Sequence, residues 1–380
     1  MTNHEEIEST MDAENTMLAH VRDLPIMLRR VFDALQSSVD ALDAGLCRSI
    51  SRIYLTGCGD SHHAGLTTEM AFESMAGVAT EPLTALQFGR YAAEFAPSGS
   101  LVIGISVSGS AARTAEALAS GRRHGALTMA VTGGRGSRVA RAAEHALFVD
   151  LPAFPDPSPN GAPGVRSYAC NQLALFLLAV RLGEVRGRLS EAEGVRLRSE
   201  LEALADAAEQ TILDNETNAR ALAEELAGDA GAVGAVFLGA GPNYGTALFS
   251  AAKLIEACGD SAIGQDTEEW AHLQYYARAP SPTFLVSAGG RDLSRTREVA
   301  AAVTAIGRRI FPVMPRSAAR AIGDAPGFVL PEGIPEMFSP LIAAIPAEMY
   351  AAHRAAAIGE TYFRVGLGGD VSRIRTSEIV

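Results

Sequence analysis

Two glycine- and serine-rich turns carry the chemistry that stands out first in the sequence. Each follows a short apolar run, in ISRIYLTGCGDSHHAG at residues 50–65 and in LVIGISVSGSAART at residues 101–114. A strand, a small-residue turn and a helix start together place backbone N–H groups and hydroxyls at the positive end of a helix, where anions bind well. The residues predicted to contact such an anion are Gly57, Gly59, Ser61, Ser106, Ser108 and Ser110.

A plainer interpretation treats both turns as ordinary connections in which serine caps a helix. That interpretation is favoured for one turn alone. Two serine-rich turns at matching strand ends favour an anion pocket lined by hydroxyls, which we interpret as a sugar-phosphate site. A dinucleotide site is less well supported, because GCGDSH lacks the third glycine of GxGxxG.

The elements that must position these turns follow an α/β pattern. Strands and helices that alternate in this way predict a parallel sheet with helices on both faces. Ligands of such sheets bind beyond the carboxyl ends of the strands, where the glycine turns fall. The predicted strands lie near residues 53–57, 101–106, 127–132 and 146–150, and the predicted helices near 61–77, 111–124, 136–143 and 167–182.

The second half of the chain repeats the first. AVFLGAGPNYG begins at Ala235 and matches IYLTGCGDSHH, which begins 182 residues earlier at Ile53. TFLVSAGG, RRIFPVMP and GFVLPEG match three further segments of the first half at nearly the same spacing. Four matches in one register predict a tandem duplication of one α/β lobe, with the two copies related by a pseudo-twofold axis.

The repeat divides the chain into four predicted segments. A helical lead occupies residues 1–47, where Pro25 is expected to divide or kink the helix. The first lobe follows at 48–188 and is expected to hold the phosphate site. A charged helical linker is predicted at 189–230, and the second lobe with a C-terminal tail at 231–380.

Composition excludes several classes of partner. The net charge is −12 and no lysine- or arginine-rich tract is present, which argues against nucleic acid. The four cysteines form no CxxC pair, which fits a reducing cytoplasm better than a zinc site or disulfide scaffold. The acidic N-terminus lacks the features of a signal peptide, and no apolar run approaches the roughly 20 residues of a membrane span. We therefore expect a cytoplasmic protein without a membrane partner.

GCGDS, ISVSGS, the GVRS stretch at 164–167 and the repeated lobe together resemble the sugar isomerase (SIS) family. The arrangement is most similar to the isomerase half of glutamine–fructose-6-phosphate aminotransferase and to fructosamine-6-phosphate deglycases, over about residues 45–380. The resemblance implies two flavodoxin-like three-layer lobes and a sugar-phosphate substrate, with no cofactor. It also implies a homodimer or higher homo-oligomer with shared active sites. Because only a short helical lead precedes the first lobe, no glutaminase activity is expected.

The resemblance assigns roles to individual residues. Ser61, Ser106 and Ser108 would bind phosphate, and Ser167 would open the helix after a proline-rich loop. The family's proton-shuttling glutamate falls on Glu256, and its ring-opening histidine, which comes from a neighbouring subunit, falls on His272. Further positions that it implies near the sugar are Lys253 and Arg375.

The chemistry explains why a carboxylate and an imidazole would be needed. Interconversion of an aldose and a ketose moves a proton between C1 and C2 through an enediol or enediolamine, which one carboxylate can do. The cyclic sugar must open first, and an imidazole that titrates near neutrality suits that proton transfer. The same groups could release an amine from a fructosamine phosphate. Without the family, Glu256 would be interpreted as a solvated helix carboxylate and His272 as a surface histidine.

Departures from the family pattern point to an unusual substrate. The family's SQSGET is SVSGSA here, so Val107 and Ala111 replace a glutamine and a threonine. Ser110 could replace the lost hydroxyl, and Arg113 could pair with a differently placed anionic group. Ile379 stands where the family has a lysine near the sugar, which argues against amination of fructose 6-phosphate.

Two other functions stay open. The chain could be a non-catalytic sugar-phosphate sensor, although a sequence with both Glu256 and His272 favours catalysis. It could also be a structural duplicate with a closed pocket. A metal site at His62 and His63 is not expected, because adjacent side chains point to different faces of a helix and no ligand follows at i+4.

Overall fold

The computed structural model describes residues 15–155, 161–228, 234–278, 281–323 and 325–364. The chain forms two compact units. The first-lobe unit is built on Ile26–Pro152 and Ser167–Ala205. The second-lobe unit is built on Asp206–Gly368, together with the segments Met1–Pro25 and Ala153–Arg166. Each unit is described below by itself, and the four-segment division of the sequence analysis stays a prediction.

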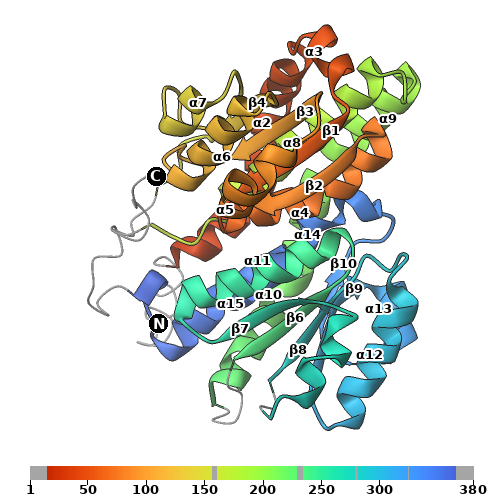
Figure 1. The fold of residues 1–380 in the computed structure, drawn as a ribbon. Coiled ribbons are helices and arrows are strands. Elements are labelled where there is room, and N and C mark those ends of the chain that lie inside the picture. Colours follow the sequence, from red (N-terminus) through yellow and green to blue (C-terminus); the bar gives the residue numbers. More distant parts are fainter. Residues whose placement is uncertain (1–14, 156–160, 229–233, 279–280, 324, 365–380) are drawn as a thin grey trace. The chain divides into compact units, whose positions relative to one another are not determined.

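The first-lobe unit contains a five-stranded parallel sheet in the order β2-β1-β3-β4-β5 (Figure 1). Its strands are β1 (Arg52–Gly57), β2 (Ala79–Thr84), β3 (Ser100–Ile105), β4 (Leu127–Thr132) and β5 (His145–Phe148). Its helices are α3 (Ala44–Ser49), α4 (Asp60–Ala71), η1 (Phe72–Ala76), α5 (Ala85–Gln87), η2 (Phe88–Ala92), η3 (Ala93–Phe95), α6 (Ala112–Arg123), α7 (Arg138–Ala142), α8 (Arg166–Val185) and α9 (Glu191–Glu202).

The second-lobe unit contains a second five-stranded parallel sheet, in the order β10-β9-β8-β6-β7. Its strands are β6 (Ala235–Gly239), β7 (Ala262–Asp266), β8 (Thr283–Val286), β9 (Ile310–Pro315) and β10 (Phe328–Leu330). Its helices are α10 (Leu204–Gly228), α11 (Pro242–Cys258), η4 (Glu269–Ala271), η5 (Gln274–Tyr276), α12 (Leu293–Ala305), α13 (Arg316–Ile322), η6 (Glu336–Phe338), α14 (Ser339–Ala343), α15 (Ile345–Ile358) and η7 (Tyr362–Arg364).

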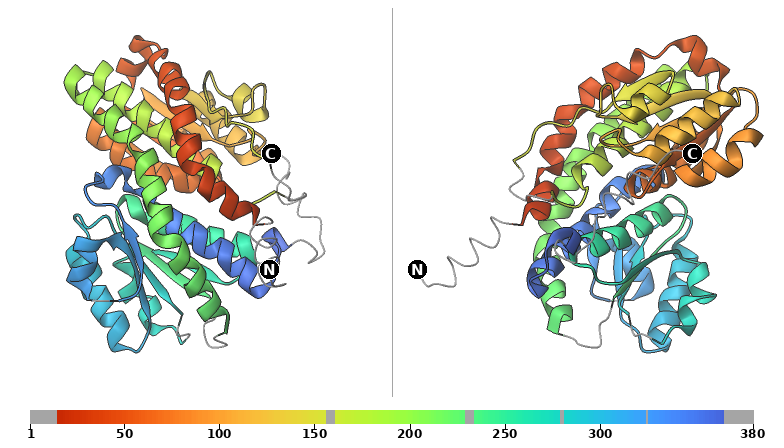
Figure 2. Two further views of the ribbon diagram at one scale, coloured as in Figure 1. Left: turned by 180° about the vertical axis from the view of Figure 1, so that it is seen from behind. Right: turned by 60° about the vertical axis from the view of Figure 1, so that its left-hand side comes forward.

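Numbered from the first strand of each lobe, both sheets have the order 2-1-3-4-5, which is that of flavodoxin-like folds. In Figures 1 and 2 the second-lobe sheet lies between α11 on one side and α12 and α13 on the other. The predicted α/β class with two parallel-sheet lobes is confirmed. The pseudo-twofold relation between the lobes stays a prediction.

The edge strands β2 and β7 were not predicted from the sequence. Strand β2 reads ATEPLT, in which Glu81 and Pro82 interrupt the apolar pattern. Among the described strands it pairs only with β1, so it is an edge strand. An edge strand tolerates proline because the N–H groups on its outer side need no partner strand. The central strand β3, SLVIGI, is buried throughout, as expected of a parallel strand covered on both faces.

The long helix α2 (Thr16–Asp40) continues through Pro25, so this part of the predicted lead is one helix and not two. Apolar side chains recur along it at helical spacing and are buried, among them Leu18, Val21 and Leu28. Tertiary packing of this stripe accounts for a helix that tolerates one missing N–H donor.

The turns after β1 and β6 have the same unusual backbone. Gly59 caps α4 with φ 54° and ψ −127°, and Gly241 caps α11 with φ 53° and ψ −131°. Only glycine adopts these angles without strain. A Cβ on Gly57 would lie 2.8 Å from the Cβ of Ser61, and one on Gly239 would lie 2.1 Å from the carbonyl oxygen of Asn243. The duplication therefore extends to the geometry of the helix starts.

Candidate functional site

The two predicted turns of the first lobe lie side by side. Strands β1 and β3 are parallel neighbours, with Thr56 opposite Gly104, so both turns begin at the same edge of the sheet. The Sγ of Cys58 lies 4.0 Å from the Oγ1 of Thr114, across the two turns. Ser61 is buried at the start of α4, and its N–H donates to the carbonyl of Cys58 at 3.2 Å.

The turn after β3 brings two hydroxyls together. The Oγ atoms of Ser108 and Ser110 lie 2.7 Å apart and both side chains are exposed. Ser106 is buried, and its backbone N–H donates to the carbonyl of Val131 at 3.0 Å. Gly109 has φ 69°, and a Cβ there would lie 1.9 Å from the Oγ of Ser137, so the turn requires glycine.

A cavity of about 360 Å³ opens at the carboxyl ends of β3, β4 and β5, beside the start of α8. Of the predicted ligands, Ser108 and Ser167 line it together. Ser61, Ser106 and Ser110 are not among its lining residues. The full lining is Val107, Ser108, Gly133, Gly134, Val149, Asp150, Leu151, Ser167 and Asn171.

Two polar residues of this cavity were missed by the sequence analysis. Asn171 lies four residues after Ser167 on α8, so both side chains share one helix face, and it is 3% exposed. Asp150 follows β5 directly and forms an ion pair with Arg135. The i, i+4 spacing from Ser167 could have identified Asn171, and the position after an apolar strand could have identified Asp150.

The second lobe holds a cavity at the equivalent place, but it is nearly filled. It lies at the ends of β8, β9 and β10 beside α14, and its volume is about 10 Å³. Pro315 stands at the position that Gly133 occupies in the first lobe. Most of the lining residues are apolar. The lining consists of Ala288, Pro315, Leu330, Pro331, Ile334, Ser339 and Ile342. Of the two equivalent positions, the first-lobe one therefore has room and polar groups for a ligand.

The turn after β8 also differs from its first-lobe counterpart. The Oγ of Ser287 donates to one oxygen of Asp292 at 2.9 Å, and the Oγ1 of Thr296 donates to the other at 3.2 Å. Burial raises the pKa of Asp292 above its ordinary value, against these hydrogen bonds. Burial and the nearby Asp292 raise the pKa of Glu336 as well. Two carboxyl groups at this turn disfavour the binding of an anionic ligand here.

Arg113 contacts a carboxylate of its own helix. Its Nη1 donates to Glu116, and the Nε of Arg90 donates to the other oxygen of Glu116 at 2.9 Å. Burial alone would raise the pKa of Glu116, but the hydrogen bonds from Arg90 and Arg113 lower it below its ordinary value. The role proposed for Arg113 with a ligand anion stays a prediction.

Glu256 and Lys253 are brought together on α11, as their spacing on the helix predicts. The Nζ of Lys253 forms an ion pair with the carboxylate of Glu256. The Lys253 side chain is 0% exposed, whereas that of Glu256 is 32% exposed. The ammonium also lies 4.9 Å from the ring centre of Phe249. A buried cation thus holds one oxygen of a carboxylate that solvent can still reach.

His272 follows η4 and its side chain is 64% exposed. Its Nε2 lies 3.4 Å from a carboxylate oxygen of Glu268, which is also paired with Arg295. The hydrogen bond from Arg295 lowers the pKa of Glu268, with a smaller contribution from His272. The predicted serines lie in the first-lobe unit, whereas Glu256 and His272 lie in the second-lobe unit, so a common site stays a prediction.

The other positions named in the sequence analysis are Arg375, His62 and His63. Arg375 lies outside the described residues. The Nδ1 of His63 lies 3.9 Å from Asp60, and burial lowers the pKa of His62. Within the described ranges, no three His, Cys, Asp or Glu side chains gather as a metal-ion site, and no helix is long and apolar enough to span a bilayer.

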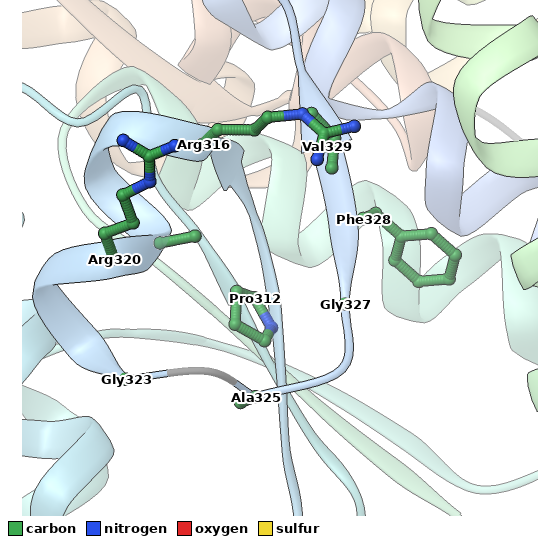
Figure 3. A pocket seen from close by; sticks show the side chains of 9 residues that line it. Pro312, Arg316, Arg320, Gly323, Ala325, Gly327, Phe328 and Val329 are labelled. Atoms are coloured by element: carbon green, nitrogen blue, oxygen red, sulfur yellow. The ribbon is translucent and has the colours of Figure 1, made fainter.

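A further cavity of about 230 Å³ lies between α13 and the edge strand β10 (Figure 3). Arg316 and Arg320 extend from α13 at one end of it, and Pro312 and Phe328 also contribute to its lining. None of the residues predicted from the sequence lines this cavity, so it does not belong to the predicted site.

Comparison with known proteins finds one matching family model and several similar sequences and structures. Residues 47–178 match the SIS domain family. The chain is 33% identical to glutamine–fructose-6-phosphate aminotransferase (isomerizing) of Symbiobacterium thermophilum over 251 residues, 63% of this chain and 39% of that one. It is 28% identical to the enzyme of the same name from Gloeobacter violaceus over 352 residues, 90% of this chain and 56% of that one. The chain thus spans about half the length of the curated relatives that it matches.

Solved structures show the same fold. The C-terminal domain of glucosamine-fructose-6-phosphate aminotransferase from Francisella tularensis superposes with a TM-score of 0.79 at 19% identity, covering 90% of this chain and 96% of that one. Tagatose-6-phosphate ketose/aldose isomerase from Escherichia coli superposes with a TM-score of 0.73 at 17% identity, covering 92% and 95%. Residues 47–178 thus form a SIS domain, and the chain as a whole has the fold of these two solved structures.

Proposed function

We propose that this chain is an enzyme that interconverts the aldose and ketose forms of a sugar phosphate, or releases the amine of a ketosamine phosphate, through an enediol or enediolamine. The observation that carries the proposal is the open cavity of the first lobe, which hydroxyl, amide and carboxylate side chains help to line, compared with its nearly filled counterpart in the second lobe. At about 360 Å³ it lies within the roughly 300–1,000 Å³ of small-molecule sites.

Neutral groups would bind the phosphate. Ser108 and Ser167 line the cavity, and Ser110 lies beside Ser108. Hydroxyls and the N–H groups at a helix start bind an anion without a full positive charge. Since Val107 stands among them where the family has a glutamine, we expect weaker phosphate binding and a larger share of recognition by the sugar or its substituent.

Glu256 would move the proton between C1 and C2. Its carboxylate accepts the proton from one carbon and returns it to the other, and the buried Lys253 ammonium fixes the orientation of the carboxylate. His272 would open the sugar ring. Because His272 is 64% exposed in its own chain, we propose that it serves the site of a second copy, so the active form is a homodimer.

The test is proton exchange from solvent. Wild-type protein and the Glu256→Gln variant are incubated in deuterated water with fructose 6-phosphate, glucosamine 6-phosphate and a fructosamine 6-phosphate. We expect deuterium at C1 or C2 with wild type and with the control Glu224→Gln, which changes an exposed residue of α10, but not with Glu256→Gln.

Two results would overturn the proposal. Binding of these ligands without exchange would make the protein a sensor and not an isomerase. Neither exchange nor a rise in the unfolding temperature with any of them would overturn the proposal for hexose 6-phosphates, since a ligand specific to the native state raises that temperature.

A further inference from the structure

The segment Thr267–Ala277, which we call the arm, follows β7 on the way to β8 and carries His272. It consists of two single turns of 3-10 helix, η4 and η5, with His272 between them. Such turns have weak hydrogen-bond geometry and are marginal alone. Leu273, Tyr275 and Tyr276 are all exposed, and of these the ring of Tyr275 meets that of buried Trp270 edge-on at 6.0 Å. Trp270 fixes η4 in the core of the second lobe, and η5 needs contacts of its own.

Arg308 supplies those contacts. It precedes β9 and is 9% exposed. Its Nη1 donates to the carbonyl of Gln274 at 2.6 Å, and its Nη2 donates to the carbonyl of Ala277. Its guanidinium carbon also lies 6.0 Å from the ring centre of Trp270, which is fully buried. One planar cation therefore joins both ends of η5 and the buried side chain of η4.

This geometry requires arginine in particular. A guanidinium presents several N–H groups in a rigid fork, whereas the lysine ammonium is a point charge on a flexible stem. Lysine at this position could bind one of the two carbonyls but not both, so η5 would lose one of its two bonds to this side chain. The backbone N–H of Arg308 donates to Val303 at 3.1 Å, which fixes the start of the side chain against α12.

The other end of the arm is held by charges at the surface. Glu268 pairs with Arg295 of α12 and faces the Nε2 of His272 at 3.4 Å. The N–H of Glu268 also donates to Asp266 at 2.8 Å. These contacts orient the ring of His272, but exposed pairs of this kind contribute little stability. Trp270 is buried in the core at η4, and Arg308 is the buried anchor of η5.

We propose that Arg308 is a positioning residue for ring opening: it holds the arm so that the imidazole of His272 meets the ring oxygen of a cyclic sugar phosphate. The inference rests on the function proposed above. It predicts that loss of the guanidinium fork slows the opening of a cyclic substrate and leaves the later transfer between C1 and C2, which belongs to Glu256, unchanged.

The anchoring is tested without a substrate by amide hydrogen exchange. Wild type is compared with Arg308→Lys and with the control Arg309→Lys. Arg309 is the next residue along the chain and pairs with exposed Glu225, not with the arm. We expect the N–H groups of Leu273, Tyr276 and Ala277, which bond within the arm, to exchange about tenfold faster in Arg308→Lys only. Equal protection in all three proteins would overturn the anchoring.

The role in ring opening is tested with two substrates. Fructose 6-phosphate cyclises, whereas 5-deoxyfructose 6-phosphate lacks the hydroxyl that closes the ring. We expect Arg308→Lys to lower kcat about tenfold for the first and to leave the second unchanged. Equal losses on both would show a general structural defect and overturn the role. If wild type turns over neither, the role in ring opening fails for this sugar, while hydrogen exchange still decides the anchoring and the fructosamine 6-phosphate experiment above still decides the proposed function.

Discussion

The turns after β3 and β8 differ in sequence and in the partners of their hydroxyls, since Gly289 and Arg291 stand where the first lobe has Ser108 and Ser110. In the second lobe, Asp292 accepts hydrogen bonds from Ser287 and Thr296 and occupies the turn with negative charge. In the first lobe, Ser108 and Ser110 bond to each other and stay exposed. The fold is the same in both places, so binding depends on which residue supplies the acceptor for these hydroxyls.

Asn171 is where a charge can be tested with little change in shape. Asn171→Asp replaces a neutral amide inside the cavity by a carboxylate of the same size. We expect the affinity for sugar phosphates to fall at least tenfold, or about 1.4 kcal/mol, because two anions would share a buried site. Isothermal calorimetry measures it. Asn171→Ala, which stays neutral, should lose less, and equal losses in both variants would contradict an anion in this cavity.

Glu69 on α4 makes stability depend on pH. Burial, with Glu73 and Glu81 nearby, raises the pKa of Glu69 from its ordinary 4.5 to about 7. The native state therefore keeps a proton that the unfolded chain has lost, and stability should fall as pH rises from about 4.5 to 7. Above that window the loss is complete.

Glu69→Gln should remove this decline. We expect the variant to be similar to wild type near pH 4.5 and more stable at pH 8 by about 1 kcal/mol, since partial solvent exposure screens the effect. The unfolding temperature across this range provides the measurement. A difference between the two proteins that stays constant with pH would contradict the explanation.

At the scale of elements, the turns that begin α4 and α11 position the candidate residues. Helices α4 and α11 begin after glycines with nearly equal and unusual angles, at Gly59 and Gly241. Short, backbone-dictated turns bring each helix close to its strand, and this closeness is why Gly57 and Gly239 also tolerate no side chain. The position of Ser61 and of the helix that bears Lys253 and Glu256 therefore follows from local backbone conformation.

Alanine at these caps should test that conclusion. A Cβ on Gly59 or Gly241 meets no atom within 4 Å, so the cost of Gly59→Ala and Gly241→Ala is backbone strain alone, about 1–3 kcal/mol each. Gly228→Ala, at the last residue of α10 and equally unobstructed, should change the free energy of unfolding by less than about 0.5 kcal/mol, because neither strain nor a mid-helix position is involved. Chemical denaturation compares the three. Similar small effects in all of them would exclude strain at the caps.

For the whole molecule, the proposed sharing of active sites between two copies has a quantitative consequence. Glu256→Gln and His272→Ala homodimers should each be inactive. When they are mixed and allowed to exchange, half of the dimers are mixed, and each has one intact site composed of Glu256 from one chain and His272 from the other.

The mixture should thus recover about a quarter of wild-type activity. Mass spectrometry of the native complexes establishes that mixed dimers have formed. Mixed dimers without any activity would show that both groups serve the same chain, and a purely monomeric protein would exclude shared sites altogether.

The sequence by itself determined the fold class and the strand-turn-helix repeats, because apolar periodicity and glycine turns act over a few residues. It also placed Lys253 and Glu256 on one helix face, since three residues span nearly one helical turn. Edge strand β2 escaped prediction, because an edge position tolerates the proline that the local pattern argues against.

Only the tertiary structure decided which of the two equivalent cavities stays open and that Asn171 and Asp150 line it. It alone showed that Arg308 anchors the arm that carries His272. These features depend on side chains from strands and helices far apart in the chain. The volume of a cavity and the hydrogen bonds inside it depend on how these distant side chains pack together, and a local sequence pattern contains no information on that packing.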